Sequence, residues 1–188
     1  MDYINEIKAY IERETSVLKA LDTGAVNAAM NLLAETIAGK KNAFIFGNGG
    51  SAAAASQFAN DFNKGLYECT DMKPRFISLS ENVAALTAIA SDIGYDEVFH
   101  FQLRARISPG DLVIAISVSG NSANVIKAAE YAKMRENKVI GLTGYSGGKL
   151  RELADVSLHA PVDSKQITED IHTIFGHLMM SVFCAASR

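Results

Sequence analysis

Hydrophobic residues recur every three or four positions through the first forty residues of the chain. This spacing places apolar side chains on one face of a helix and predicts two amphipathic helices, over residues 3–20 and 23–39. Asp22-Thr23-Gly24 predicts the turn between them. The apolar faces of these helices need a surface that covers them, and a partner subunit can supply it. We therefore expect residues 1–40 to lie in an oligomer interface.

Beyond residue 40 the period changes, and short apolar runs alternate with helical segments. The runs predict strands over residues 42–47, 75–80, 111–117, 138–143 and 156–160. The segments between and after them predict helices over residues 51–64, 82–90, 95–107, 121–136, 147–153 and 165–186. Nearly continuous apolar strands that alternate with helices indicate a parallel sheet covered on both faces. The predicted fold is α/β, a three-layer αβα sandwich, and no composition shift divides residues 1–188 into more than one domain.

Composition and charge exclude several classes of function. The chain has 188 residues and a formal net charge of −3, without a run of like charges. We therefore expect neither a nucleic-acid-binding nor a membrane-binding face. No apolar run approaches the roughly 18 residues that a membrane span needs.

The cysteines and the first residues bear on the compartment. Cys69 and Cys184 are the only cysteines in the chain. Two distant cysteines do not make a disulfide framework, so we expect two reduced, partly buried thiols in a reducing compartment. The first residues lack the basic start and apolar stretch of a secretory signal. We expect a cytoplasmic protein.

Two predicted strands end in unusual loops. The first strand leads into Gly47-Asn48-Gly49-Gly50-Ser51, and the third leads into Ser117-Val118-Ser119-Gly120-Asn121-Ser122. In an open parallel sheet, ligands bind beyond the carboxyl ends of the strands. Glycine lets backbone N–H groups approach an anion, a helix start adds unpaired N–H groups, and serine hydroxyls donate to phosphate oxygens. Each loop alone is also typical of a helix cap or turn, but together they predict a neutral phosphate cradle that needs no lysine or arginine.

The first loop also fits a dinucleotide-binding pattern, Gly-x-Gly-x-x-Ala, through Gly47, Gly49 and Ala52. That pattern requires an acidic residue about 20 residues further on. The nearest candidate, Glu81, lies well past that distance. A dinucleotide site also gives no reason for the serine-rich second loop, so we rank it lower and expect no nucleotide cofactor.

At these loops the sequence resembles the SIS (sugar isomerase) family, and within it the phosphoheptose isomerases. The resemblance spans nearly the whole chain in the right order, and its motifs are specific together rather than singly. The matching stretches are residues 46–52 (FGNGGSA), 85–90 (ALTAIA), 92–99 (DIGYDEVF) and 116–125 (ISVSGNSANV), Gly141-Leu-Thr-Gly144 with Gly147-Gly148, and the closing helix around Glu169-Asp-Ile-His172 and His177.

The resemblance implies a five-stranded parallel sheet of the flavodoxin-like kind and a homotetramer with active sites between subunits. It implies an aldose–ketose isomerase, an intramolecular oxidoreductase that converts sedoheptulose 7-phosphate to D-glycero-D-manno-heptose 7-phosphate for bacterial surface-polysaccharide synthesis. A threonine that is usual in the family is Val118 here, so the cradle lacks one hydroxyl. The residues matched to the family's phosphate site are Asn48, Gly49, Gly50, Ser51, Ser117, Ser119 and Ser122.

The resemblance also places a reacting cluster on two helices. The family supplies a His and a Glu four residues apart and a Gln and a His eight apart, and these can hold zinc. The matching residues here are Gln57, Asp61, Glu169 and His177. Gln57 replaces an imidazole, the better zinc ligand. Asp61 is one methylene shorter than Glu, which displaces a catalytic base by about 1 Å.

Two interpretations of this cluster stay open. Two carboxylates and one imidazole can bind one divalent cation, which is zinc by family resemblance or a harder metal. The cluster can equally act without a metal, with Asp61 or Glu169 as base and His177 as acid. Both interpretations make these three residues the candidate catalytic groups.

Further polar residues match less specific positions. Asp92 matches an acidic residue that the family uses near the sugar hydroxyls, and Gln166 is a candidate contact to the open-chain sugar. His172 precedes His177 by five residues, so the two rings point to different faces of the helix. We expect a core or supporting role for His172, or a place facing a neighbouring subunit's site. His100 and His159 are expected to be structural.

A second class of function stays open. Some members of the family bind a sugar phosphate or a protein partner without catalysis, for regulation or assembly. The departures at Gln57, Asp61 and Val118 favour such a module, because they alter the residues that the family uses for catalysis and phosphate binding.

Overall fold

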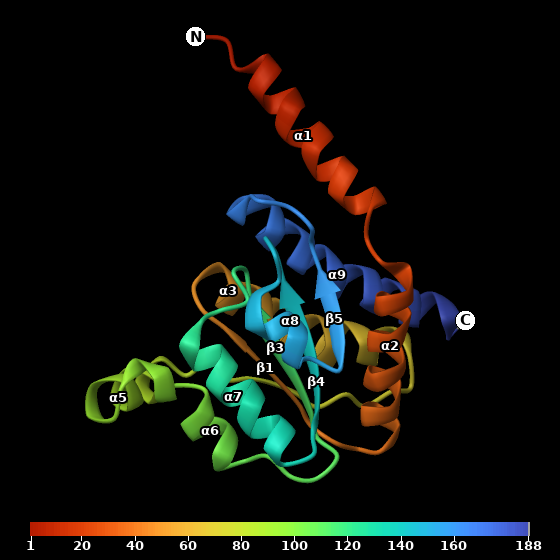
Figure 1. Cartoon of the computed structure of the whole chain (residues 1–188). Coiled ribbons are helices and arrows are strands. Elements are labelled where there is room, and N and C mark those ends of the chain that lie inside the picture. Colours follow the sequence, from red (N-terminus) through yellow and green to blue (C-terminus); the bar gives the residue numbers. More distant parts are fainter. Residues whose placement is uncertain (188) are drawn as a thin grey trace.

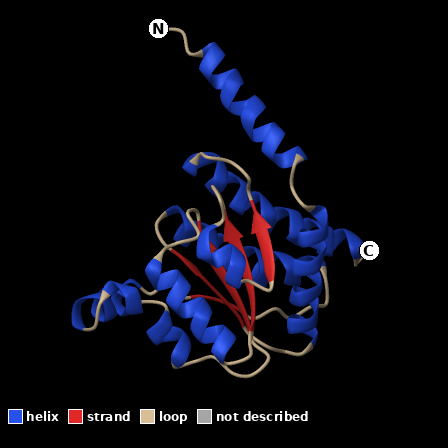
Figure 2. Ribbon diagram, viewed as in Figure 1, coloured by secondary structure: helices blue, strands red, loops and turns tan. Residues whose placement is uncertain are grey.

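The predicted apolar runs form one parallel sheet. The structure is a computed structural model, and it describes residues 1–187. The described chain contains a five-stranded sheet of order β2-β1-β3-β4-β5, with parallel pairing throughout. The predicted α/β fold is confirmed (Figures 1 and 2). The strands are β1 (Ala43–Gly47), β2 (Phe76–Ser78), β3 (Leu112–Ser117), β4 (Lys138–Thr143) and β5 (Val156–His159).

Side chains of the central strands pack on both faces of the sheet. Successive residues of a strand point to opposite sides, and in β1 the rings of Phe44 and Phe46 pack on one face while Ile45 packs on the other. Both β1 and β3 are buried along their whole length, as expected of strands covered on both sides. Helices α2 (Thr23–Ala38), α3 (Gly50–Asn60) and α9 (Lys165–Ala186) cover the Ile45 side (Figure 1). The opposite side carries α5 (Val83–Asp92), α6 (His100–Arg104), α7 (Ala123–Met134) and α8 (Gly148–Leu153).

The strand order creates a switch point between β1 and β3. From β1 the chain crosses to β2 on one side, and it later returns to place β3 on the other side. Gly47 at the end of β1 pairs with Ile116 near the end of β3. The two loops that carry the glycine and serine motifs therefore begin side by side, where open α/β sheets bind their ligands.

Two predicted helices differ from the structure in their details. The helix expected over residues 51–64 is longer, because α3 continues into a π-helix, η1 (Asp61–Leu66), and then into α4 (Tyr67–Cys69). The helix expected over residues 95–107 is instead a 3₁₀ turn, η2 (Tyr95–Glu97), followed by the short α6. Apolar spacing does not distinguish these helix types, since the choice depends on hydrogen bonding to the third, fourth or fifth residue.

Helix α1 (Ile4–Lys19) extends away from the rest of the molecule (Figure 1). Its apolar side chains are exposed, with Val17 as the buried residue of the helix. The stripe that predicts burial is thus uncovered within the single chain. No helix in residues 1–187 combines the length and apolar character that a membrane crossing requires. The exposed large apolar side chains of α1 are Ile4, Ile7, Tyr10, Ile11 and Leu18.

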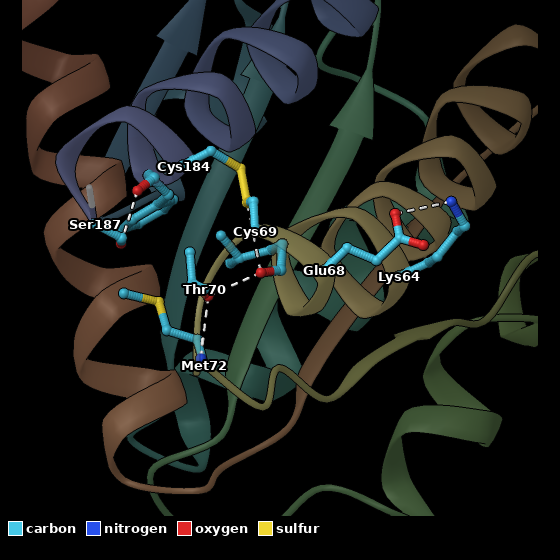
Figure 3. The surroundings of a disulfide bond; sticks show 9 residues. Lys64, Glu68, Cys69, Thr70, Met72, Cys184 and Ser187 are labelled. Atoms are coloured by element: carbon cyan, nitrogen blue, oxygen red, sulfur yellow. Dashed lines mark hydrogen bonds and ion pairs between the residues drawn. A yellow bond between two sulfur atoms is a disulfide. The ribbon is translucent and has the colours of Figure 1, made fainter.

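The expectation of two reduced cysteines is wrong. Cys69 at the end of α4 and Cys184 in α9 form a disulfide, with their Cα atoms 5.5 Å apart. The prediction failed because it used the separation along the chain, which is 115 residues. Helix α9 packs against the helical run that ends at Cys69, and this packing brings the two sulfurs together (Figure 3).

Candidate functional site

A cavity of about 310 Å³ opens at the switch point, beyond the ends of β1 and β3. Both predicted loops contribute to it, and so does the first part of α9. Larger hollows exist elsewhere on the surface, but the chemistry expected of the motifs gathers in this one. The lining residues are Asn48, Ser51, Ile116, Ser117, Val118, Ser119, Ser122, Tyr145, Lys165 and Glu169.

The first loop leads directly into the N-terminus of α3. Its N-cap residue, Gly49, has no side chain to cap the helix, and the N–H groups of Ser51 and Ala52 donate instead to the carbonyl oxygens of Asn48 and Gly49. Glu169 lies against this point, because a Cβ placed on Gly50 would come 2.5 Å from the Glu169 carboxylate. Glycine at position 50 therefore makes room for a carboxylate at the helix N-terminus, where negative charge is favoured.

The second loop presents its hydroxyls on one side. The Oγ atoms of Ser117 and Ser122 lie 3.0 Å apart, and Ser119 Oγ accepts a hydrogen bond of 3.2 Å from the Asn121 N–H. Gly120 has a φ of +68°, and a Cβ there would collide with the carbonyl oxygen of Gly147. The β4–α8 loop thus supports the serine loop from behind, which explains why both segments belong to the same set of motifs.

Asn48 is held by other side chains rather than left free for a ligand. Its amide exchanges two hydrogen bonds of 2.9 Å with the amide of Asn124. The hydroxyl of Tyr95 donates a further bond of 2.8 Å to Asn48 Oδ1. Asn48 therefore ties the first loop to α7 and to η2. Asn124 and Tyr95 were not singled out in the sequence, although both lie inside matched stretches.

Lys165 brings a positive charge to the cavity that the sequence analysis did not anticipate. Its side chain lines the cavity at the first residue of α9, and its Nζ lies 3.9 Å from Glu169 Oε1. That the cradle needs no lysine stays a prediction, and the structure places Lys165 in its lining. The sequence feature that could have revealed Lys165 is its position at the start of the closing helix, next to the candidate Gln166.

Three of the four predicted cluster residues meet on α3, η1 and α9. Gln57 Nε2 donates a hydrogen bond of 2.7 Å to Asp61 Oδ1, and His177 Nε2 lies 3.2 Å from Asp61 Oδ2. Asp61 is only 9% exposed, and its Oδ2 makes no hydrogen bond within the described residues. A buried carboxylate oxygen without a hydrogen bond is costly and marks a candidate site of chemistry. His177 is about half exposed, so a ligand can reach this pair from solvent.

Glu169 does not join this cluster, and the cluster does not fit zinc. Glu169 lines the cavity beside the serine loops. Among residues 1–187, no three His, Cys, Asp or Glu side chains lie close enough to hold a metal ion. The amide nitrogen of Gln57 points at Asp61, and an amide N–H₂ is a donor that cannot ligate a cation. Gln57 thus holds one oxygen of the Asp61 carboxylate in a hydrogen bond and offers no imidazole to a metal, while Oδ2 faces His177.

The remaining candidate residues lie outside the cavity lining. Asp92 is exposed at the end of α5, and Gln166 is exposed on α9 next to Lys165. His172 is fully buried, and this burial lowers its pKa to about 4. His159 hydrogen-bonds with Thr143 at 3.0 Å, and burial lowers its pKa as well. His100 contacts Glu97, as expected of a structural histidine.

A doubly wound parallel sheet with a hydroxyl-lined cavity at its switch point defines an α/β protein whose candidate ligand site lies beyond the strand ends. The sequence pattern of the SIS domain family matches residues 2–144. The chain belongs to this family, and the resemblance inferred from its motifs is confirmed.

Similar proteins agree over almost the whole chain. The phosphoheptose isomerase of Aliarcobacter butzleri is 38% identical over 178 residues, which covers 94% of this chain and 94% of that protein. The phosphoheptose isomerase of Helicobacter pylori strain 26695 is 38% identical over 174 residues, covering 92% and 90%. The structure of phosphoheptose isomerase from Neisseria gonorrhoeae superimposes with a TM-score of 0.88 at 32% identity, covering 98% of this chain and 100% of that one.

Proposed function

We propose that this chain is an aldose–ketose isomerase that converts sedoheptulose 7-phosphate to D-glycero-D-manno-heptose 7-phosphate. The observation that carries the proposal is the combination of a serine-lined cradle with a carboxylate–imidazole pair, in which Asp61 of η1 is buried and His177 of α9 is half exposed. Ser51 and Asp61 lie ten residues apart in the sequence, about 15 Å along a helix axis. This length suits a long-chain sugar phosphate better than a triose phosphate.

The phosphate end of the substrate is assigned to the two loops. The hydroxyls of Ser51, Ser117, Ser119 and Ser122 donate to phosphate oxygens, and the N–H groups at the start of α3 face the same anion. The ammonium group of Lys165 balances part of the charge. Glu169 shares this cavity and carries a negative charge, so it turns from the helix N-terminus toward the sugar hydroxyls when phosphate binds. Asp92 and Gln166 are proposed to contact the sugar through a neighbouring subunit, since both are exposed in one chain.

The reacting end is assigned to Asp61 and His177. Asp61 removes a proton from C1, the C1–C2 double bond forms, and His177 donates a proton to the C2 oxygen. The resulting enediol returns to a carbonyl when Asp61 gives its proton to C2 and His177 takes the proton from the C1 oxygen. No net proton is gained or lost. Gln57 holds Asp61 with its hydrogen bond and leaves Oδ2 free for the proton.

The assay follows sedoheptulose 7-phosphate by NMR with the full-length protein, with and without added divalent cations. We expect the heptose 7-phosphate to form without added metal. Asp61→Asn keeps the shape but removes the base, and it should lower kcat by about 10²–10⁴-fold with little loss of phosphate affinity. Glu68→Gln, on the same helical run but outside the cavity, serves as the control.

The alternative is a non-catalytic module that binds a sugar phosphate for regulation or assembly. The exchange of the family His and Glu for Gln57 and Asp61 favours it. This module would bind the sugar phosphate, measured by calorimetry, without converting it, and His177→Ala would leave the affinity unchanged. Binding without turnover in every metal condition contradicts the isomerase.

The assembly and location of the protein complete the proposal. We propose a homotetramer of single-domain subunits (residues 1–188), with residues 1–40 in the interface, and a cytoplasmic role in surface-polysaccharide synthesis. The exposed apolar side chains of α1 support the interface, since a large uncovered apolar face is typical of a contact surface. The names of the similar bacterial proteins, phosphoheptose isomerases, support a heptose phosphate as the substrate.

A further inference from the structure

The disulfide joins the two segments that carry the candidate acid–base pair (Figure 3). Cys69 ends the helical run that begins with α3 and includes Asp61 at the start of η1. Cys184 lies on α9, seven residues after His177. Seven residues make about two helical turns, so Cys184 and His177 share one face of α9.

Contacts between these segments repeat at three successive levels. At the first, His177 Nε2 lies 3.2 Å from Asp61 Oδ2. At the second, a Cβ on Gly65 would lie 2.8 Å from Met180 Sδ, so the backbone of η1 rests directly on α9. The third is the disulfide. The two helical segments therefore run side by side in the same direction, with the acid–base pair at one end and a covalent bond at the other.

The segment between these two ends is a π-helix. Its hydrogen bonds reach to the fifth residue, and such turns are short and often occur at functional sites. A shift of one residue in a helix rotates a side chain by about 100°. Asp61 opens this segment and Cys69 follows its end. A bond that holds the far end on α9 therefore limits how far the near end can move from His177.

Reagents in solution can reach the disulfide. Both cysteines are partly exposed. Cys69 lines a surface hollow of about 620 Å³. In a reducing compartment a disulfide is rare and, where present, is usually transient or redox-sensing.

We propose that the Cys69–Cys184 disulfide is a redox-sensitive positioning element for the Asp61–His177 pair. A dithiol supplies two electrons and two protons, the S–S bond breaks, the chain gains two thiols, and the dithiol becomes its own disulfide. Reduction frees η1 from α9, misplaces Asp61 relative to His177 and lowers turnover. The two cysteines are positioning residues that do not touch the substrate, and this proposal rests on the isomerase function.

The test compares oxidised full-length protein with protein reduced by dithiothreitol, with the thiol content checked by mass spectrometry. We expect kcat to fall about tenfold on reduction, KM to change by less than about twofold, and reoxidation to restore kcat. Cys184→Ser should have the kcat of the reduced protein, and dithiothreitol should not change it. Ser187→Ala retains the disulfide and should behave as wild type. Circular dichroism and inorganic phosphate binding verify that each variant is folded.

A second readout does not depend on turnover. The NMR chemical shifts of the His177 ring, recorded at one fixed pH, should differ between the oxidised and reduced proteins, because the Asp61 carboxylate lies 3.2 Å from the ring in the oxidised form. An unchanged kcat together with unchanged His177 ring shifts after reduction overturns the proposal. An oxidised protein without isomerase activity instead refutes the proposed function, and the His177 ring shifts then still decide the positioning role.

Discussion

Asp61 has a different partner on each carboxylate oxygen. Gln57 donates to one oxygen, and His177 faces the other, which is buried and lacks a hydrogen bond within residues 1–187. A hydrogen bond from a neutral amide fixes the carboxylate without adding charge. An amide at position 57 thus leaves His177 as the imidazole beside Asp61, and imidazole is the better zinc ligand.

Gln57→His restores an imidazole beside Asp61 and His177 and should create a zinc site. Zinc prefers imidazole and carboxylate ligands, so we expect the variant to bind zinc at least about tenfold more tightly than wild type. Calorimetry with zinc chloride and metal analysis of dialysed protein measure the change. Gln57→Glu tests whether charge alone suffices. A wild-type protein that binds zinc as tightly as Gln57→His contradicts this account of the cluster.

His172 predicts a specific dependence of stability on pH. Burial lowers its pKa in the folded protein to about 4, against an ordinary value of 6.5. Between these values the unfolded chain binds the proton and the folded chain does not, so stability rises with pH over this range and is lost as the pH falls toward 4. The resulting change in the free energy of unfolding between pH 4 and pH 7 amounts to about 3 kcal/mol. Urea unfolding of His172→Gln from pH 4 to 7 should show a flatter dependence than wild type, and an unchanged slope contradicts the assignment.

At the scale of elements, the contact of α3 and η1 with α9 positions both ends of the site. Small residues allow the close approach. A Cβ on Gly176 would lie 2.7 Å from the Phe58 ring, and one on Gly65 would lie 2.8 Å from Met180 Sδ. The two neighbours differ, since the ring is rigid and packed while the methionine is flexible.

Gly176→Ala should therefore destabilise the protein more than Gly65→Ala. Overpacking against a rigid ring costs about 1–3 kcal/mol, and the higher helix propensity of alanine recovers about 1 kcal/mol. At Gly65 the Met180 side chain can move aside, so we expect little net change there. Urea denaturation of both variants measures the difference, and equal losses would contradict the role given to Phe58.

At the scale of the whole molecule, α1 stands apart from the sandwich that contains the site (Figure 1). Tyr10 donates a hydrogen bond to Asp170 of α9, and this bond raises the pKa of Tyr10 to about 12. Arg13 donates a second hydrogen bond to the Asp163 carbonyl oxygen, and Val17 is buried, but the other large apolar side chains of α1 stay exposed. Most of the stability of a helix in a protein comes from packing of its apolar face. The subunit interface proposed above would provide that packing for α1.

Charges placed in the α1 stripe should dissociate the oligomer. Ile7→Asp and Ile11→Asp bury a carboxylate if the stripe lies in an interface, and such a cost disfavours association. Light scattering coupled to gel filtration should report a tetramer for wild type and smaller species for the double variant. Glu6→Gln, beside the stripe, serves as the control. A wild-type monomer contradicts the interface.

Much of the fold follows from local patterns. An apolar run such as residues 112–117 predicts a buried strand, because a strand covered by helices on both faces needs apolar side chains on both sides. The two loops were also found from local patterns. A glycine- and serine-rich loop after one strand is typical of a helix cap or turn, but two such loops at the same edge of a sheet indicate a binding site. Lys165, Asn124 and the disulfide were missed, because each depends on which distant segment lies alongside.

The sequence by itself determined the succession of strands and helices along the chain, the family, and the residue types that meet at the cradle. These depend on periodicity and on motifs of neighbouring residues. Only the tertiary structure decided that Glu169 lies beside the α3 N-terminus while Asp61 meets His177, and that Cys69 reaches Cys184. The physical reason is packing. The angle and register of α9 against α3 and η1 arise from many side-chain contacts at once, and no single stretch of sequence encodes them.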